Sequence, residues 1–244
     1  MKRVTVAALL FFSVAGAIAM GAQQKAPDDV NVDALTKECQ GSASDGSHAP
    51  ATSKGMNFVW YIPKEFWQVS LQQNKSVTPE QAEQTIKELD GIFIVCVVRS
   101  KVDRTGTFDF IDEETVSKNL VVQFTGNDGK ATTLQVVEEL NPTTGAILGA
   151  MKPAIRANMG NMGKAMYFFV YKDTGKDGKR LVTPTTPGKL SVTMKPVAGE
   201  NGGTLDIPFP LNALFVPREC SKCHAKDLNV QWQFCPHCGT ALKA

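Results

Sequence analysis

The spacing of apolar residues predicts one clear helix in the stretch "SVTPEQAEQTIKELDG". Ala82, Ile86 and Leu89 recur at intervals of four and three residues, which places them on one helix face. Thr78 fits the N-cap position, the proline after it fits the first helical position, and Gln81 completes a capping box. The pattern therefore predicts a helix that begins after Thr78 and ends before the glycine of the "DG" pair.

Downstream of this helix the pattern becomes that of β-strands. The run "GIFIVCVVRS" is continuously apolar and rich in β-branched residues, as expected for a central strand buried on both faces. The stretch "NLVVQFTGNDGKATTLQVVEEL" predicts a hairpin around Asn127-Asp128-Gly129. With "MNFVWYI", "TGTFDFID", "AMYFFVY", "GKLSVTM" and "GTLDIPFPL", about eight short strand candidates follow one another at fairly regular spacing. We therefore predict a mainly β fold with one or two short helices and a β-sandwich-like body.

Residues 141–165, "NPTTGAILGAMKPAIRANMGNMGKA", fit neither period. They predict a long ordered loop or a broken helix that crosses the sheet. This region and the residue that follows it contain closely spaced methionines, namely Met151, Met159, Met162 and Met166. Thioethers on one helix face could bind Cu(I), whereas methionine more often fills irregular gaps in a core. Two glycines between them also weaken any helix that would align them.

The first residues, "MKRVTVAALLFFSVAGAIAMGAQQ", predict export. Two basic residues precede an apolar run at 4–17, and "AIA" at 17–19 matches the small-x-small cleavage pattern. We interpret 1–19 as a signal peptide, with a mature chain that begins at Met20. The alternative is that the run at 4–20 stays uncleaved as a membrane anchor. Both alternatives place the rest of the chain in the periplasm, at the cell surface or outside the cell.

The remaining chain divides into three parts. Residues 20–55 are rich in small and polar residues and have almost no apolar period, so we interpret them as a flexible linker with one short helix around 32–38. A β-rich globular domain covers 56–217, and a small C-terminal unit covers 218–244. The formal net charge of +2 falls to zero once the two basic residues of the signal peptide are removed. With no clustered basic face, nucleic acid is excluded as an expected partner.

The C-terminal unit, "ECSKCHAKDLNVQWQFCPHCGTALKA", carries two Cys-x-x-Cys pairs. Eleven residues separate the second cysteine of the first pair from the first cysteine of the second pair. Each pair can fold as a tight knuckle, and two facing knuckles place four thiolates tetrahedrally around one Zn²⁺ ion. Val230, Trp232 and Phe234 alternate between the pairs as in a strand, and we expect Trp232 and Phe234 at the packing face of the unit.

This stretch resembles a short zinc ribbon of the kind often appended to bacterial proteins. The resemblance covers about the last twenty-five residues and departs from the family at His224, where the first knuckle commonly carries glycine. It implies one structural zinc ion. The ligands that it implies are Cys220, Cys223, Cys235 and Cys238.

Other interpretations of the cysteines stay open beside zinc. Cys220, Cys223 and His224 form the Cys-x-x-Cys-His motif of c-type haem attachment. The same thiols could exchange disulfides as redox pairs, or simply oxidise to two disulfides in an oxidising compartment. Cys39 and Cys96 could also pair with each other after export.

The histidines narrow the functional classes. The chain has three, His48, His224 and His237, and none lies in the β-rich domain. A Ser-His-Asp or Cys-His site there would need a histidine from elsewhere. We therefore expect a non-enzymatic exported protein that binds another protein or a cell-envelope component. The alternatives are a c-type haem electron-transfer protein and a periplasmic metal-handling or thiol-redox protein.

Overall fold

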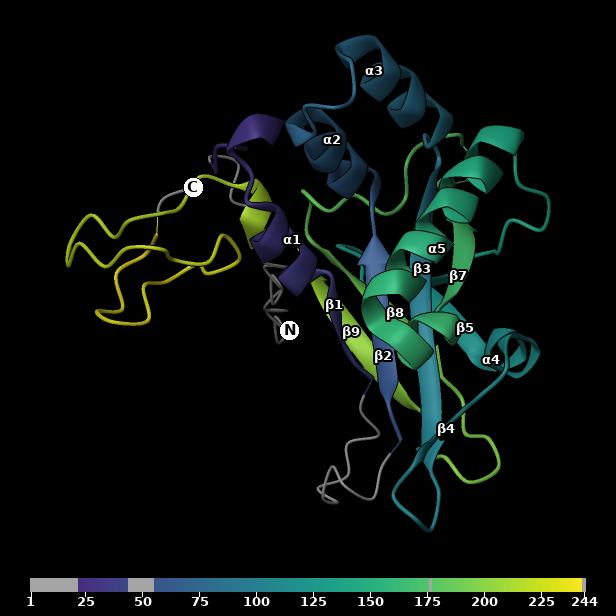
Figure 1. The fold of residues 1–244 in the computed structure, drawn as a ribbon. Coiled ribbons are helices and arrows are strands. Elements are labelled where there is room, and N and C mark those ends of the chain that lie inside the picture. Colours follow the sequence, from purple (N-terminus) through teal and green to yellow (C-terminus); the bar gives the residue numbers. More distant parts are fainter. Residues whose placement is uncertain (1–21, 44–54, 176, 243–244) are drawn as a thin grey trace, which may run out of the picture.

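The computed structural model describes residues 22–43, 55–175 and 177–242, which form two facing antiparallel sheets, several helices and a projecting C-terminal segment (Figure 1). This segment, residues 218–242, is called the ribbon below. The mainly β class expected from the sequence is confirmed. The expected signal peptide and His48 lie outside the described residues. Among the described helices, none combines the length and the apolar character that a membrane span requires.

The first sheet is built around one long strand. Its members are β1 (Gln40–Ser42), β2 (Asn57–Ile62), β3 (Ile92–Val102), β4 (Phe108–Phe110) and β7 (Tyr167–Lys172). Strand β3 lies at the centre and pairs antiparallel with β2, β4 and β7, while β1 extends the sheet beyond β2. The central position of β3 agrees with its continuous apolar run.

The second sheet has the order β6-β5-β8-β9. Its strands are β5 (Leu120–Gly126), β6 (Ala131–Thr133), β8 (Gly188–Met194) and β9 (Gly203–Phe209). The predicted hairpin joins β5 and β6, and Gly129 in its turn has a positive φ of 72°. Glycine adopts this left-handed conformation without the steric cost that a Cβ brings.

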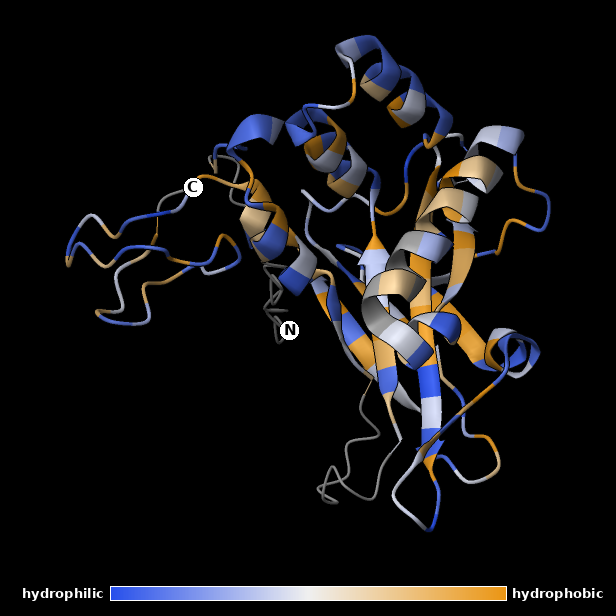
Figure 2. Ribbon diagram, viewed as in Figure 1, coloured by the Kyte–Doolittle hydropathy of each residue, from blue (hydrophilic) through white to orange (hydrophobic). Residues whose placement is uncertain are grey.

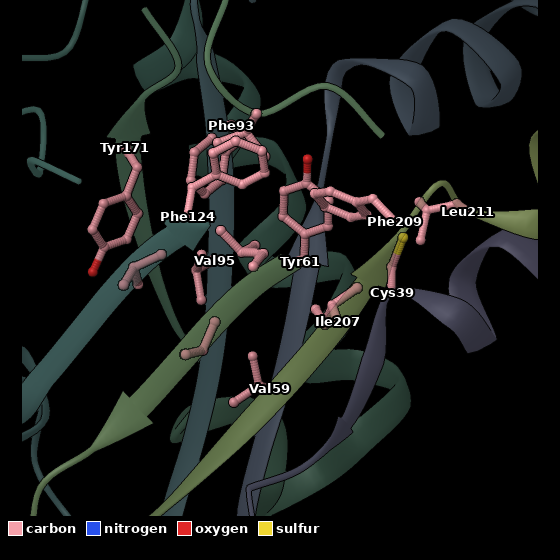
Figure 3. Packing of buried hydrophobic residues seen from close by; sticks show 14 of the residues in the cluster. Cys39, Val59, Tyr61, Phe93, Val95, Phe124, Tyr171, Ile207, Phe209 and Leu211 are labelled. Atoms are coloured by element: carbon pink, nitrogen blue, oxygen red, sulfur yellow. The ribbon is translucent and has the colours of Figure 1, made fainter. Parts of the chain in front are cut away.

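Strand β3 explains why both faces of the first sheet are covered. Its alternate residues Phe93, Val95 and Val97 belong to the core between the two sheets. Phe93 and Val95 lie near Tyr61 in this core (Figure 3). The intervening residues, Ile94, Cys96 and Val98, belong to a second cluster on the outer face of the sheet. Because successive side chains point to opposite faces, two apolar clusters require an uninterrupted apolar sequence.

Helix α5 (Pro142–Lys164) covers this outer face (Figures 1 and 2). Gly160, with φ 54° and ψ −128°, is non-helical, so the expected broken helix is confirmed. Met166 is buried, and Met151 and Met162 pack partly buried against the outer cluster. This packing supports the gap-filling role of these three methionines, while the side chain of Met159 lies outside the description.

Three further helices surround the sheets, namely α2 (Lys64–Gln73), α3 (Pro79–Glu88) and α4 (Glu113–Asn119). In α3 the capping box is complete, because Gln81 N donates to Thr78 Oγ1 and Thr78 N donates to Gln81 Oε1. Helix α2 was not expected from the sequence. The described residues thus contain more helix than the apolar pattern indicates.

Part of the expected flexible linker is folded against the body. Helix α1 (Val32–Glu38) agrees with the short helix expected there, and the short 3-10 helix η1 (Pro27–Asp29) precedes it. Leu35 and Cys39 have no exposed surface and belong to the core between the sheets. Over 22–43, therefore, the linker interpretation is corrected, because a short amphipathic segment buries apolar side chains on the body.

Cys39 and Cys96 are both free and buried. Cys39 lies in the core between the sheets, whereas Cys96 lies in the cluster on the outer face of the first sheet. The sheet separates the two thiols, so the structure contains no disulfide between them.

Candidate metal centre

The first knuckle is closed by two backbone hydrogen bonds. Cys220 N donates to Ala225 O at 2.9 Å, and His224 N donates to Cys220 O at 2.9 Å. The turn over residues 221–223 between them brings Cys220 and Cys223 to one side. Two cysteines separated by two residues are therefore sufficient to present both sulfurs together.

The second knuckle is closed by the same two backbone hydrogen bonds, at the same spacing from its first cysteine. Cys235 N donates to Thr240 O at 2.8 Å, and Gly239 N donates to Cys235 O at 2.9 Å. The equivalent hydrogen bonds make Cys235 and Cys238 the counterparts of Cys220 and Cys223. The two knuckles are thus near copies in backbone structure, although their sequences share little beyond the cysteines.

The four sulfurs converge. All four Sγ atoms lie within 4.8 Å of one another, and they form the one such group of metal-ligating side chains in the described chain. The Cys220–Cys238 and Cys223–Cys235 sulfur distances are both 3.6 Å. A tetrahedral Zn²⁺ ion with Zn–S bonds of about 2.3 Å needs sulfurs about 3.8 Å apart, so the residues fit such an ion. Metal-binding geometry was expected from the sequence and agrees with this cluster.

The immediate surroundings favour thiolates at two of the cysteines. Backbone N–H groups of Cys223 and Lys222 hold the pKa of the Cys220 thiol below its usual value. The Thr240 hydroxyl, 3.3 Å from Cys238 Sγ, and the Thr240 backbone N–H lower the pKa of the Cys238 thiol to about 6. These donors stabilise the charged form that binds metal.

Cys223 is the cysteine whose thiol is held neutral by its neighbours. The backbone N–H of Ala225 lowers its pKa, but the neighbouring thiols of Cys238 and Cys235 outweigh this effect and raise it to about 12. Four thiolates this close repel one another, so they cannot all ionise by themselves. A divalent cation at the centre would compensate this repulsion and allow all four to be charged.

His224 is the position at which the chain departs from the zinc-ribbon pattern. Its φ is 56°, close to the 71° of Gly239 at the equivalent position of the second knuckle. Its Nδ1 lies 3.0 Å from Glu219 Oε1, and three quarters of the side chain is exposed (75%). The departure is therefore accommodated by a left-handed histidine without a change in the fold of the knuckle.

The convergence of two cysteine pairs also bears on haem. A c-type haem would use Cys220 and Cys223 and leave Cys235 and Cys238 without a role. In the structure these last two sulfurs meet the first two within 4.8 Å. The geometry therefore favours one ion shared by four sulfurs over a porphyrin attached to the first pair.

The ribbon has almost no hydrophobic core apart from the sulfurs. Its separate cluster contains three buried residues, Cys220, Leu228 and Cys235, and two of these are candidate ligands. Ala225, Cys238 and Leu242 pack against them partly buried. So small a core cannot hold a segment of this length without a cross-link or a metal.

The expected packing role of Trp232 and Phe234 is wrong. They are among the exposed large hydrophobic residues, at 43% and 60% exposure. The strand alternation on which that expectation depended does not form, because Trp232 N donates to Asn229 O in a turn. Val230 packs instead, at 5% exposure, as part of the core of the body.

The ribbon is joined to the body by polar contacts that the sequence did not indicate. Val230 N donates to Asn212 Oδ1 at 2.8 Å, in the 3-10 helix η3 (Asn212–Leu214). Gln231 Nε2 donates to Pro210 O at 2.9 Å. Within the ribbon, Arg218 Nη1 donates to the Trp232 carbonyl oxygen at 3.1 Å. Isolated polar residues in turns follow no periodic pattern, so no sequence signal could have assigned these partners.

The N-terminal segment also reaches the base of the ribbon. Val216 N donates to Gln23 O at 2.8 Å, and Lys25 N donates to Leu214 O at 2.9 Å.

Comparison with known proteins adds no relative to this description. No family model matches the chain, and no curated protein or solved structure is significantly similar to it.

Proposed function

We propose that the four cysteines hold one structural zinc ion and that the zinc-bound ribbon serves an exported, non-enzymatic protein as a binding module. The observation that carries this proposal is the convergence of the four sulfurs within 4.8 Å. The backbone hydrogen bonds of both knuckles, which are those of a metal-binding turn, also support it.

The ligand set supports zinc in a structural role. Thiolates select soft or borderline metals, and four of them around one ion form a closed tetrahedral site with no position for substrate. Two of the candidate ligands, Cys220 and Cys235, are buried at 0% and 1% exposure. A buried, fully protein-ligated ion stabilises the fold rather than activating water.

The exposed aromatic residues support a role in binding. Trp232 and Phe234 lie on a ribbon whose polar contacts with the body, through Asn212 and Gln231, fix its position. Aromatic side chains are enriched at protein interfaces and carry much of their binding energy. We assign to this pair the contact with another protein or a cell-envelope component in the periplasm, at the cell surface or outside the cell.

Metal and thiol counts on the protein purified from the exported fraction test the zinc assignment. We expect one zinc per chain by elemental analysis. A thiol reagent should find four reactive thiols after a chelator is added to the native protein, and six after denaturation, because Cys39 and Cys96 are buried. No metal together with two disulfides in freshly purified protein would contradict the proposal.

A pair of variants tests the binding surface. Trp232→Ala with Phe234→Ala should abolish crosslinking of the exported protein to its neighbours, since the aromatic contact area is lost. Phe108→Ala is the matched control, because Phe108 is also an exposed aromatic residue (48%) but lies on β4 in the body. Equal loss of crosslinks in both variants would contradict a binding role for the ribbon.

A further inference from the structure

We propose that the four-cysteine centre is a redox-controlled metal site, in which peroxide releases the metal and links Cys220 to Cys238 and Cys223 to Cys235. The inference depends on the proposed metal binding but goes beyond it, since a purely structural ion would stay in place. It predicts that the ribbon has two closed states, one joined by metal and one joined by disulfides.

The geometry supports this pairing. Two sulfur contacts run between the two knuckles, from Cys220 to Cys238 and from Cys223 to Cys235, at 3.6 Å each. A disulfide bond of about 2.05 Å requires each pair to approach by about 1.5 Å. Neither knuckle has to unfold for its sulfurs to make these bonds.

The burial pattern indicates where oxidation begins. Cys223 is the exposed cysteine of the four, whereas Cys220 and Cys235 are buried and Cys238 is intermediate. A small oxidant therefore meets the Cys223 sulfur first. The buried sulfur of Cys235 lies 3.6 Å from it, close enough to attack the oxidised sulfur.

The chemistry balances with hydrogen peroxide as the oxidant. The Cys223 thiolate attacks one peroxide oxygen, the O–O bond breaks, and a sulfenic acid and hydroxide form. The Cys235 thiolate then attacks the Cys223 sulfur, forms the disulfide and expels a second hydroxide. A second peroxide oxidises Cys220 and Cys238 in the same way. Four thiolates thus lose four electrons to two peroxides, and the divalent cation leaves without its ligands.

The consequence for the fold follows from which residues are joined. Each disulfide connects the first knuckle to the second, as the metal does. Val230 and Gln231, which contact the body, lie in the loop between the knuckles and therefore stay enclosed. Disulfides within each Cys-x-x-Cys pair would instead leave the two knuckles unconnected.

Peptide mapping of the zinc-loaded, full-length protein separates these outcomes. Trypsin cleaves after Arg218, Lys222, Lys226 and Lys243, which places Cys220 in "ECSK", Cys223 in "CHAK" and the other two cysteines in "DLNVQWQFCPHCGTALK". After two equivalents of peroxide we expect release of all the zinc to a colorimetric chelator and one species of three linked peptides. A linked "ECSK"–"CHAK" pair would overturn the proposal.

Fragmentation of the three-peptide species assigns the individual bonds. Cleavage before Pro236 separates Cys235 from Cys238, so "ECSK" should remain attached to "PHCGTALK". Attachment of "ECSK" to the Cys235 fragment would overturn the stated pairing. Cys39 and Cys96 serve as internal controls, because both have no exposed surface and should be recovered as free thiols.

Failure of this inference can be told from failure of the proposed function. Protein that contains no metal before peroxide is added contradicts the proposed function. Protein that contains one zinc and keeps it through two equivalents of peroxide, with four thiols recovered after denaturation and chelation beyond Cys39 and Cys96, contradicts the redox inference alone.

Discussion

His224 has a backbone conformation that residues other than glycine rarely adopt. Its φ of 56° matches the 71° of Gly239 in the second knuckle, where a glycine meets the same requirement. A left-handed residue with a Cβ costs roughly 1–2 kcal/mol. The first knuckle is therefore held in its conformation by the rest of the ribbon, including the hydrogen bonds of Cys220 N to Ala225 O and of His224 N to Cys220 O.

Replacing His224 with glycine should strengthen metal binding. Relief of about 1 kcal/mol of strain corresponds to about a fivefold lower zinc dissociation constant, measured by competition with a chelator. Lys222→Gly is the control, because Lys222 lies in the same knuckle without a positive φ, and glycine there only adds freedom to the unfolded chain. Equal affinities for His224→Gly and the wild type would show that the conformation is not strained.

Thr240 should control the pH dependence of metal binding. Its hydroxyl is the largest cause of the lowered pKa of Cys238, so Thr240→Val should move that pKa towards its usual value near 9. Protons then compete with the metal up to a higher pH, and the metal affinity falls about tenfold for each unit by which the pKa of Cys238 rises. The loss should be full below pH 6 and disappear above pH 9. A pH-independent difference between the variant and the wild type would contradict this cause.

At the scale of elements, a buried ion pair joins the two sheets. Arg99 on β3 has no exposed surface, and its Nε donates to Glu200 Oε2 at 2.7 Å. Glu200 lies in the connection between β8 and β9, where its other oxygen accepts from Asn57 Nδ2 at 2.6 Å. The second sheet thus supplies the carboxylate that compensates a charge buried in the first.

Glu200→Gln should destabilise the body strongly. It leaves the Arg99 guanidinium buried without a counter-charge, which typically costs about 3–5 kcal/mol of the free energy of unfolding, measured in urea. Asp206→Asn is the matched control, because it breaks the exposed Lys189–Asp206 pair between β8 and β9, worth about 0–1 kcal/mol. If the two variants lose the same stability, Arg99 has another compensating partner.

The elements that the sequence predicted are those fixed by local patterns. Thr78 and Gln81 mark the start of α3 because a capping box involves residues three apart, and the turn at Asn127-Asp128-Gly129 is decided within a few residues. The continuous apolar run of β3 indicated burial on both faces. Helix α2 was missed because its first residues follow an aromatic strand and its own apolar residues show no clear period.

The same distinction holds for the candidate site. The spacing of the four cysteines predicted their convergence, since each knuckle is a local turn. The orientation of Trp232 and Phe234 could not be predicted, because it depends on contacts of Val230 and Gln231 with a distant part of the chain. Residues 22–43 were misjudged for the same reason, as their burial depends on the body.

At the scale of the whole molecule, the ribbon and the body are stabilised by different means. The body has a continuous core between its two sheets, whereas the small cluster of the ribbon is separate from it and centred on the cysteines. Figure 1 shows the ribbon projecting to one side of the molecule, beyond α1. Loss of the metal should therefore affect one part of the molecule and spare the other.

Removing the metal with a chelator under reducing conditions should open the ribbon while the body stays folded. Without the ion, repulsion between neighbouring thiolates and the small apolar cluster leave the two knuckles unconnected. Limited trypsin digestion should then cut first after Lys222 and Lys226 and leave a resistant fragment that ends near Arg218. The far-UV circular dichroism of the body should change little, because its sheets do not contain the cysteines of the centre. Simultaneous unfolding of the body would mean that the contacts of Val230 and Asn212 couple the two parts more strongly than their separate cores indicate.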